Sequence, residues 1–237
     1  MNTQLLLFLF LTIISFESVG QDIQARSLPF FNKINYEGYG SIFLEPSDAP
    51  AIKILPSNDF AREHVRTEVR NETLYVWSDL KTTLNNGFDQ QGIDVYLYYP
   101  ELKQLTLNGK IRVDGIHSIT TDHFSIDASG DISLRLPVEA KKLTAKFKGE
   151  INAALTGKVN HEVIDFKGKG SINTLALNAQ SAQITTDGKA EIFLPYIPSI
   201  QAIASGLSEI IYQKNPACRV NKIDPKHPKI KVNTKRL

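Results

Sequence analysis

A short pattern of hydrophobic and polar residues recurs six times between residues 103 and 212 of the 237-residue chain. In each copy, apolar residues alternate with polar ones into a glycine and out of it again, as in Leu105-Thr-Leu-Asn-Gly109-Lys-Ile111. The glycines of the six copies are Gly109, Gly130, Gly149, Gly170, Gly188 and Gly206, separated by 21, 19, 21, 18 and 18 residues. A near-constant period of this length indicates a repeat array.

The alternation predicts β-strands, because side chains two residues apart share one face of a strand. Apolar residues occur four residues before each glycine and two and four residues after it. The column two residues after the glycine contains Ile111, Ile132, Ile151, Ile172, Ala190 and Ser208, of which Ser208 is the weak member. Asp, Lys, Ser, Thr, Asn and Glu fill most positions between the apolar ones. Each strand therefore has one face suited to a core and one suited to water.

A repeat of about 20 residues cannot bury its apolar face alone, but stacked repeats convert each apolar column into a continuous core. The sequence therefore predicts an all-β fold, a parallel β-helix with coils of about 18–21 residues. We expect right-handed winding, since crossovers between parallel strands strongly favour that hand. A six-bladed propeller would need roughly 40–45 residues per blade, so the period excludes it.

The region before the regular array is less periodic and predicts an irregular N-terminal cap. Val65-Arg-Thr-Glu-Val69 and Thr73-Leu-Tyr-Val-Trp77 are typical of a hairpin, and Ile93-Asp-Val-Tyr-Leu-Tyr-Tyr99 of a single strand. Residues 79–92 are polar and predict an exposed loop. The predicted segments are a signal peptide (1–20), a linker (21–27), a β-helix domain (28–216, with 28–100 as cap and first coils) and a basic tail (217–237), in which 229–232 could form a last edge strand.

The composition is that of an ordinary globular protein, with 42% hydrophobic and 22% charged residues and a net charge of +2. This charge is too small to predict a nucleic-acid partner. Residues 1–20 resemble a secretory signal, with an N-terminal membrane anchor as the alternative. No later stretch is long and apolar enough to predict a transmembrane helix in the mature chain. Cys218 is the only cysteine, so no internal disulfide is possible, and we interpret it as a small semi-buried residue rather than a reactive thiol.

Several of these features together resemble one family. Phe31-x-x-Ile34 is followed by Gly38-x-Gly40-x-Ile42-x-Leu44, then by the Leu74-Tyr-Val76 strand, the Val95-x-Leu97-x-x-Pro100-x-Leu102 strand and the serial glycine copies. This order, over about residues 28–216, resembles the head GIN domain family of putative auto-transporter adhesins. The chain departs from the family pattern at Lys148-Gly149, at Lys167-Gly-Lys-Gly170 and at Tyr212-Gln-Lys-Asn-Pro216, which lacks a glycine. The resemblance implies an exported envelope protein of Bacteroidetes-type bacteria and carries no catalytic signature.

The outward positions of the repeats predict one candidate binding surface. Lysines stand three residues and one residue before two successive glycines; they are Lys146, Lys148, Lys167 and Lys169. With coils stacked ~4.8 Å apart, they would form a two-by-two square suited to the carboxylates or sulfates of an acidic glycan. A solvated face that discourages aggregation is the alternative interpretation of the same lysines.

Catalytic or metal chemistry has weaker support. Glu191 and Glu209 would be neighbours one coil apart, the best available pair for a polysaccharide-active enzyme, although ordinary exposed positions are the favoured interpretation of both residues. The five histidines lack metal-ligand spacing, and no cofactor motif occurs. Tyrosines and Trp77 in the first third could bind sugar rings or pack the cap. The sequence thus favours a non-catalytic binding or adhesion module for glycan or an envelope protein, with an enzyme or a purely structural protein as alternatives.

Overall fold

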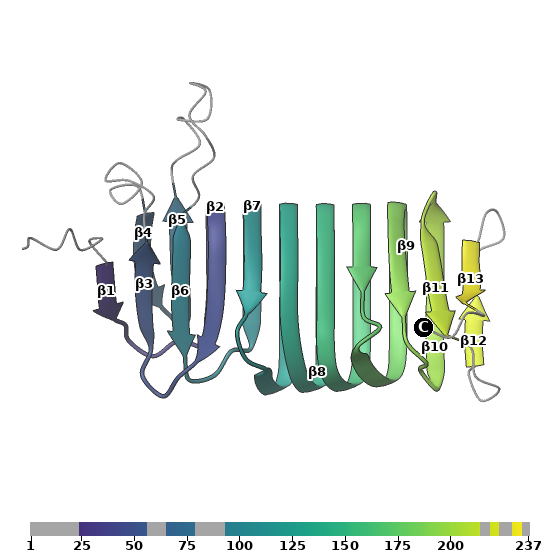
Figure 1. The fold of residues 1–237 in the computed structure, drawn as a ribbon, viewed down its shortest axis with the longest axis horizontal. Helices are drawn as coiled ribbons and strands as arrows, with labels where there is room; N and C mark the ends of the chain where they lie inside the picture. The colour runs from purple at the N-terminus through teal and green to yellow at the C-terminus, as the bar shows by residue number, and fades with distance from the viewer. Residues whose placement is uncertain (1–23, 56–64, 79–92, 214–218, 223–228, 234–237) are drawn as a thin grey trace, which may run out of the picture.

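The computed structural model describes residues 24–55, 65–78, 93–213, 219–222 and 229–233. Within these ranges every regular element is a β-strand, and thirteen strands form one mixed sheet (Figure 1). The strands are β1 (Gln24–Ser27), β2 (Lys33–Pro46), β3 (Ala51–Leu55), β4 (Val65–Arg70), β5 (Thr73–Ser78), β6 (Asp94–Tyr99), β7 (Gln104–Gly115), β8 (Ile119–Asn173), β9 (Leu177–Leu194), β10 (Ser199–Gly206), β11 (Glu209–Gln213), β12 (Arg219–Lys222) and β13 (Lys229–Asn233). The all-β prediction is confirmed.

Parallel pairing between successive repeats forms the body of the molecule. Strand β2 pairs with β7, β7 with β8, and β8 with β9, all in parallel. The 55-residue β8 bends and returns alongside itself, as Figure 1 shows. Strand β9 then pairs with β10 through its first half and with β11 through its second half. Equivalent residues of successive repeats therefore lie side by side, about 4.8 Å apart.

A row of glycines marks the same bend in every repeat. Gly38 pairs with Gly109, and Gly109 with Gly130. Gly130 and Gly149 have φ angles of +122° and +107°, which L-residues rarely adopt. A Cβ atom added at Gly149 would collide with the carbonyl oxygen of Gly130. Glycine is therefore needed here for the backbone conformation and for the close approach of the neighbouring repeat.

The member of this row that follows Gly149 is Gly168, so the prediction of Gly170 was wrong by two residues. A Cβ atom at Gly168 would meet the Gly149 carbonyl oxygen, and Gly168 pairs with Gly188. Gly170 instead lies beside Ile151 and pairs with Ala190. Because the two glycines are two residues apart, both fit the alternation equally well. The error shifts every row of side chains in this repeat by two positions.

The core occupies the inside of the stack and follows the predicted apolar columns. Ile111, Ile132 and Ile151 are 0–2% exposed, and the outward residues between them are exposed or half-buried. Phe147 and Phe166 meet edge to face, with ring centroids 6.2 Å apart. Since these side chains come from successive repeats, each repeat buries the apolar face of the next.

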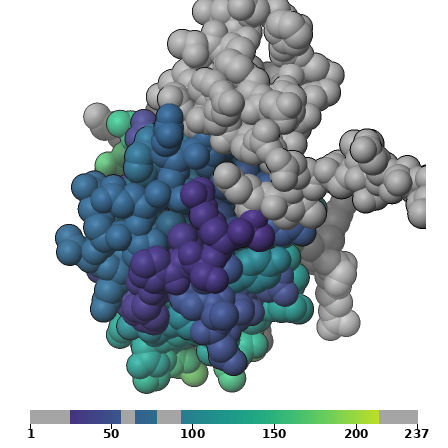
Figure 2. Space-filling model, turned by 90° about the vertical axis from the view of Figure 1, so that its left-hand side faces the viewer, coloured from purple at the N-terminus to yellow at the C-terminus, as the bar shows by residue number. Residues whose placement is uncertain are grey.

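The strands before the regular array pair in an order that differs from their order along the chain. Strand β2 lies inside the stack, with β7 on one side and β5 and β6 on the other. Strands β4 and β5 form the predicted antiparallel hairpin, and Asn71 and Glu72 in its turn have φ angles of +50° and +57°, as a tight two-residue turn requires. Strand β3 pairs antiparallel with β6, and β1 with β3, so residues 24–27 form a strand where a linker was predicted. Figure 2 shows these first strands covering one end of the stack.

The C-terminal segment continues the parallel pairing. Strand β12 pairs with β10, and β13 with β11. The edge strand predicted at 229–232 is thus confirmed as part of β13. The predicted signal peptide, the loop at 79–92 and Cys218 lie outside the described residues. In the part of the chain that the structure describes, no helix is long and apolar enough to cross a membrane.

Candidate binding surface

The outward side chains form rows that run across the strands. We name each row by its position relative to the glycine row, so that row −1 holds the residue before each glycine and row +1 the residue after it. The pairing of β2, β7, β8, β9 and β10 fixes these rows. Within β8 the glycine contacts give an offset of 19 residues between successive repeats. Any ligand that lies across the repeats would contact these rows in order.

The four predicted lysines do not form a square, because the glycine row passes through Gly168. Lys169 falls in row +1 beside Glu150, and its Nζ atom lies 2.6 Å from the Glu150 carboxylate. This hydrogen bond and the charge of Glu150 raise the pKa of Lys169. Lys169 is therefore already paired with an acid of this chain, as Lys110 is with Asp131 in the same row, at 3.6 Å.

The other three lysines keep part of the predicted arrangement. The 19-residue offset places Lys148 and Lys167 side by side in row −1, and Lys146 beside Asp165 in row −3. Lys148 and Lys167 are exposed, and neither makes an ion pair with a described residue. The four lysines thus form a staircase in which Glu150 and Asp165 occupy the two remaining corners. The net charge of the staircase is lower than that of the predicted square.

The predicted carboxylate pair is brought together. Glu191 of β9 and Glu209 of β11 are register partners in parallel strands, and Lys229 of β13 is the next residue in that row. Glu191 is exposed and Glu209 is half-buried. Among the described residues, no three His, Cys, Asp or Glu side chains are grouped so that they could hold a metal ion.

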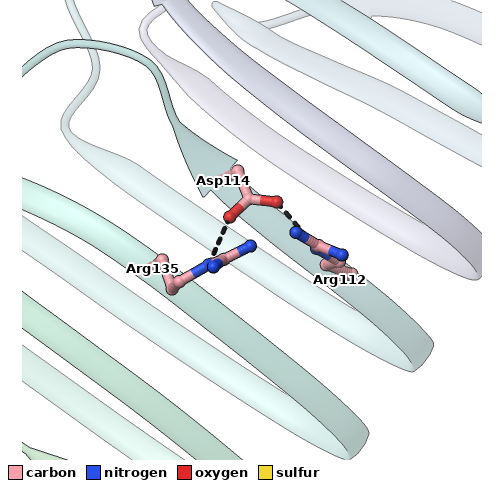
Figure 3. A network of polar contacts seen from close by, with 3 residues as sticks. All are labelled: Arg112, Asp114 and Arg135. Carbon is pink, nitrogen blue, oxygen red and sulfur yellow. Dashed lines mark hydrogen bonds and ion pairs between the residues drawn. The ribbon is translucent and has the colours of Figure 1, made fainter.

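A second charged cluster was missed at the sequence level and lies on β7 and β8. Asp114 accepts hydrogen bonds from the Nε atoms of Arg112, at 2.8 Å, and of Arg135, at 2.7 Å (Figure 3). Arg112 precedes Asp114 by two residues on the same strand face, and Arg135 is the register partner of Asp114. The Asp114 side chain is 19% exposed, whereas those of Arg112 and Arg135 are 56% and 61% exposed. Partial burial raises the pKa of the Asp114 carboxyl group, but the two guanidinium groups outweigh it and hold that pKa below its usual value.

The aromatic residues of the first third divide into core and surface. Tyr36 and Tyr99 are buried, and burial raises the pKa of both hydroxyl groups. Phe43 and Tyr96 are register partners on the outward face whose rings stack with centroids 4.6 Å apart. Lys53 covers the other side of the Tyr96 ring, 5.6 Å from its centroid. Trp77 is 38% exposed, and Phe30, just before β2, is 49% exposed, so both rings are open to a ligand in this part of the chain.

One acidic side chain lies inside the core and was also missed. Glu162 is 1% exposed, and neither oxygen of its carboxyl group has a hydrogen-bond partner among the described residues. Burial raises the pKa of Glu162 to about 8, with the nearby Thr174 hydroxyl acting in the opposite direction. That hydroxyl donates to the Phe193 carbonyl oxygen at 3.2 Å. The alternation Glu162-Val-Ile164-Asp-Phe166, counted back from Gly168, would have placed Glu162 inward.

A family model described as "Putative auto-transporter adhesin, head GIN domain" matches residues 30–216. A search of curated proteins found no match.

Solved structures share the fold at low sequence identity. A putative adhesin from Bacteroides fragilis aligns with a TM-score of 0.74 and 20% identity, over 84% of this chain and 92% of that one. A putative lipid binding protein from Parabacteroides distasonis gives 0.59 and 15%, over 90% and 97%. A putative adhesin from the same organism gives 0.57 and 17%, over 89% and 94%. At these identities the likeness is one of fold.

Proposed function

The chain belongs to the head GIN domain family of putative auto-transporter adhesins, and from this membership we propose that it is an exported, non-catalytic binding module of the bacterial cell envelope. The family name and the names of the similar structures support an adhesive role at the cell surface. An apolar run in residues 1–20 supports export.

The proposal includes a finer description of the fold, a right-handed parallel β-helix. Parallel register between repeats, with offsets of 18 to 21 residues along the glycine row, supports a solenoid. The right hand follows from the strong preference of parallel crossovers. In such a β-helix the outward rows of side chains form a long surface on which a ligand can bind without an internal cavity.

We assign an acidic glycan as the ligand, with a neighbouring envelope protein as the alternative. One observation carries the assignment: Lys148 and Lys167 lie side by side and exposed, and neither forms an ion pair within the described residues, although Asp187 is the register partner of Lys167 on β9. Two like charges directly opposite each other on neighbouring strands repel, and an anionic ligand would relieve that repulsion. Lys146 and Lys169 extend the same surface, although Lys169 shares its charge with Glu150.

A glycan array tests this function at low and high salt. The wild-type protein should bind acidic glycans, and binding should weaken as salt rises, because screening shortens the reach of the lysine charges. Charge reversal by Lys148→Glu with Lys167→Glu should abolish that binding. Lys142→Glu with Lys158→Glu changes the net charge equally at exposed positions of other rows and should leave binding largely intact. Equal loss in both double variants would show that the lysine row has no specific role.

A polysaccharide-active enzyme is the second candidate, favoured by the register of Glu191 and Glu209. Carboxyl groups about 5–5.5 Å apart are the arrangement that retaining glycosidases use. Cleavage of one polymer in a broad polysaccharide panel, lost on Glu191→Gln with Glu209→Gln, would establish this function. A panel without any cleavage would leave the binding function as the proposal.

A further inference from the structure

We propose that Arg112 and Arg135 form an oxyanion-binding site for the sulfate or carboxylate groups of a polysaccharide that lies across β7, β8 and β9. The inference rests on the proposed function only for the class of ligand, an acidic glycan. It concerns other residues and other rows than the lysines.

Hydrogen bonds to Asp114 hold the two guanidinium groups in place and leave most of their N–H donors available. A guanidinium group has five N–H donors in a rigid fork. Arg112 and Arg135 each donate through Nε to Asp114, and no other described residue receives a hydrogen bond from them. Figure 3 shows the two groups side by side as they converge on the carboxyl group. Their remaining donors are therefore preorganised, which lowers the entropy lost when an anion binds.

The cluster also has an uncompensated charge. Two guanidinium groups share one carboxylate, and the low pKa of Asp114 keeps that carboxylate ionised at neutral pH. One positive charge therefore remains over the pair. Planar forks of this kind match carboxylates and other oxyanions in bidentate geometry, which a lysine ammonium cannot do. The pair is thus suited to an oxyanion rather than to any negative surface.

The side chains beside the two arginines are short and mostly polar, so they do not project as far as the guanidinium groups. Ser41 and Ser133 are the register partners of Arg112 on its two sides. By the 19-residue offset, Asn152 follows Ser133 and Ala154 follows Arg135 in the next repeat. In the repeat after that, the same two rows hold Ser171 and Asn173, the partners of Glu191 and Phe193. A sugar chain could therefore approach the guanidinium groups closely, with hydroxyl and amide groups beneath it.

On its other side the pair borders two stacked aromatic rings, Phe43 and Tyr96. Phe43 is the register partner of Asp114 and stacks on Tyr96, which in turn carries Lys53. Bases of single-stranded nucleic acid need open aromatic faces, whereas both faces of Tyr96 and one face of Phe43 are covered. Hydroxyl-bearing neighbours and blocked rings together favour a polysaccharide over a nucleic acid.

The test compares two polymers that differ only in charge, dextran sulfate and dextran, with polygalacturonate as the carboxylate form. The purified full-length protein should bind dextran sulfate or polygalacturonate and should not bind dextran. Arg112→Lys with Arg135→Lys keeps the net charge but removes the forks, and we expect it to weaken binding by about tenfold or more. The matched control is Arg66→Lys, an exposed arginine of β4, which should bind as the wild type does.

Two further variants separate a loss of binding from a loss of folding and from an effect of the lysines. Arg135→Lys alone leaves the Arg112–Asp114 contact in place, so it is measured if the double variant does not fold, and the same direction of loss is expected. This inference is supported if the arginine variants lose binding while the double variant Lys148→Gln with Lys167→Gln binds fully. That result would contradict a role of Lys148 and Lys167 in binding. The reverse pattern would overturn this inference alone. Failure of every anionic polymer to bind would overturn both.

Discussion

The interior of the stack differs between its first and last repeats. In row +2 the buried Ile111, Ile132 and Ile151 are followed by the half-buried Gly170 and the buried Ala190. Row −2 changes in the same direction, and its members are Leu107, Ala128, Phe147, Phe166, Thr186 and Ala204. In these two rows, large apolar side chains predominate in the early repeats, Ala128 excepted, whereas small or polar ones predominate in the late repeats.

The late repeats replace apolar contact by buried hydrogen bonds. Ser208 is 2% exposed, and its hydroxyl oxygen accepts from the Ala190 N–H group at 3.3 Å and from Thr186 Oγ1 at 3.2 Å. Such bonds contribute about 1 kcal/mol each, less than the ~1.5–3 kcal/mol from burying an isoleucine side chain. In an array where each repeat contacts only its neighbours, the early repeats should therefore hold most of the stability and the late ones should open first.

The largest expected effect comes from a charge in the early core. Ile132→Asp would place an ionised group among apolar side chains, so we expect loss of cooperative folding. Ser208→Asp in the late core should leave the early repeats folded, because hydrogen-bond donors already surround that position. Circular dichroism and urea titration of both variants measure this. A cooperatively folded Ile132→Asp protein would contradict the assignment of the core, and equal unfolding of the two variants would contradict the difference between the halves.

The next effect is a pH dependence from Glu162, which lies between the two halves of the core. Its pKa is raised to about 8 in the folded protein, so the folded state keeps a proton that the unfolded chain releases. The contribution of Glu162 to stability should therefore be greatest below the unfolded pKa, about 4.3, and fall by about 1.4 kcal/mol per pH unit up to about pH 8. Within the described residues, the polar group that acts on Glu162 is the uncharged Thr174 hydroxyl.

Urea titrations between pH 4 and 9 check the Glu162 prediction. Glu162→Gln should remove most of the slope, and Glu162→Leu should also raise the free energy of unfolding at pH 7 by roughly 3 kcal/mol, since a neutral side chain has no proton to lose. Glu139→Gln, at an exposed acid of the same strand, should keep the wild-type slope. A wild-type protein whose stability does not fall over this range would show that Glu162 is solvated or paired.

A smaller effect is expected at the glycine row, again unequal between the halves. Gly149→Ala forces φ near +107° and a Cβ collision with the Gly130 backbone, so we expect a loss of about 2 kcal/mol or more. Gly206 has φ of +68°, in the left-handed region that other residues tolerate better, and the added Cβ atom would lie 2.7 Å from the Gly188 oxygen. Gly206→Ala should cost about half as much. Thermal unfolding of the two variants measures this difference. A greater loss of stability in Gly206→Ala than in Gly149→Ala would contradict the comparison of the two halves.

Alternation and turn chemistry explain what the sequence could predict. The Ile111, Ile132 and Ile151 column and the hairpin around Asn71 depend on local rules, namely period two and a turn that requires positive φ. They were predicted correctly. The neighbourhood of Glu191 and Glu209 followed from the same counting, and the register confirms it.

The remaining features depend on long-range register, which a local pattern leaves open. Gly168 and Gly170 share one strand face, and only the length of the preceding bend selects between them. That choice turns the lysine square into a staircase. The contact of Arg135 with Asp114 needs a 21-residue offset, and the position of β2 between β7 and the later β5 and β6 has no local signal. Counting along the sequence therefore predicted which residues face outward, but not which residues of successive repeats lie side by side.

The smallest effect measures how much the buried hydroxyl pair of the late core contributes. Ser208→Ala would leave the Ala190 N–H group without its side-chain acceptor and should cost about 1 kcal/mol, whereas Thr186→Val keeps that acceptor and should cost less. A double-mutant cycle in urea isolates the direct contact, with an expected coupling of about 0.5–1 kcal/mol. Thr185→Val, on the outward face, is the control and should be nearly neutral. If the coupling is absent, the hydroxyl groups do not offset the missing apolar contact, and the late repeats are weaker than their buried hydrogen bonds suggest.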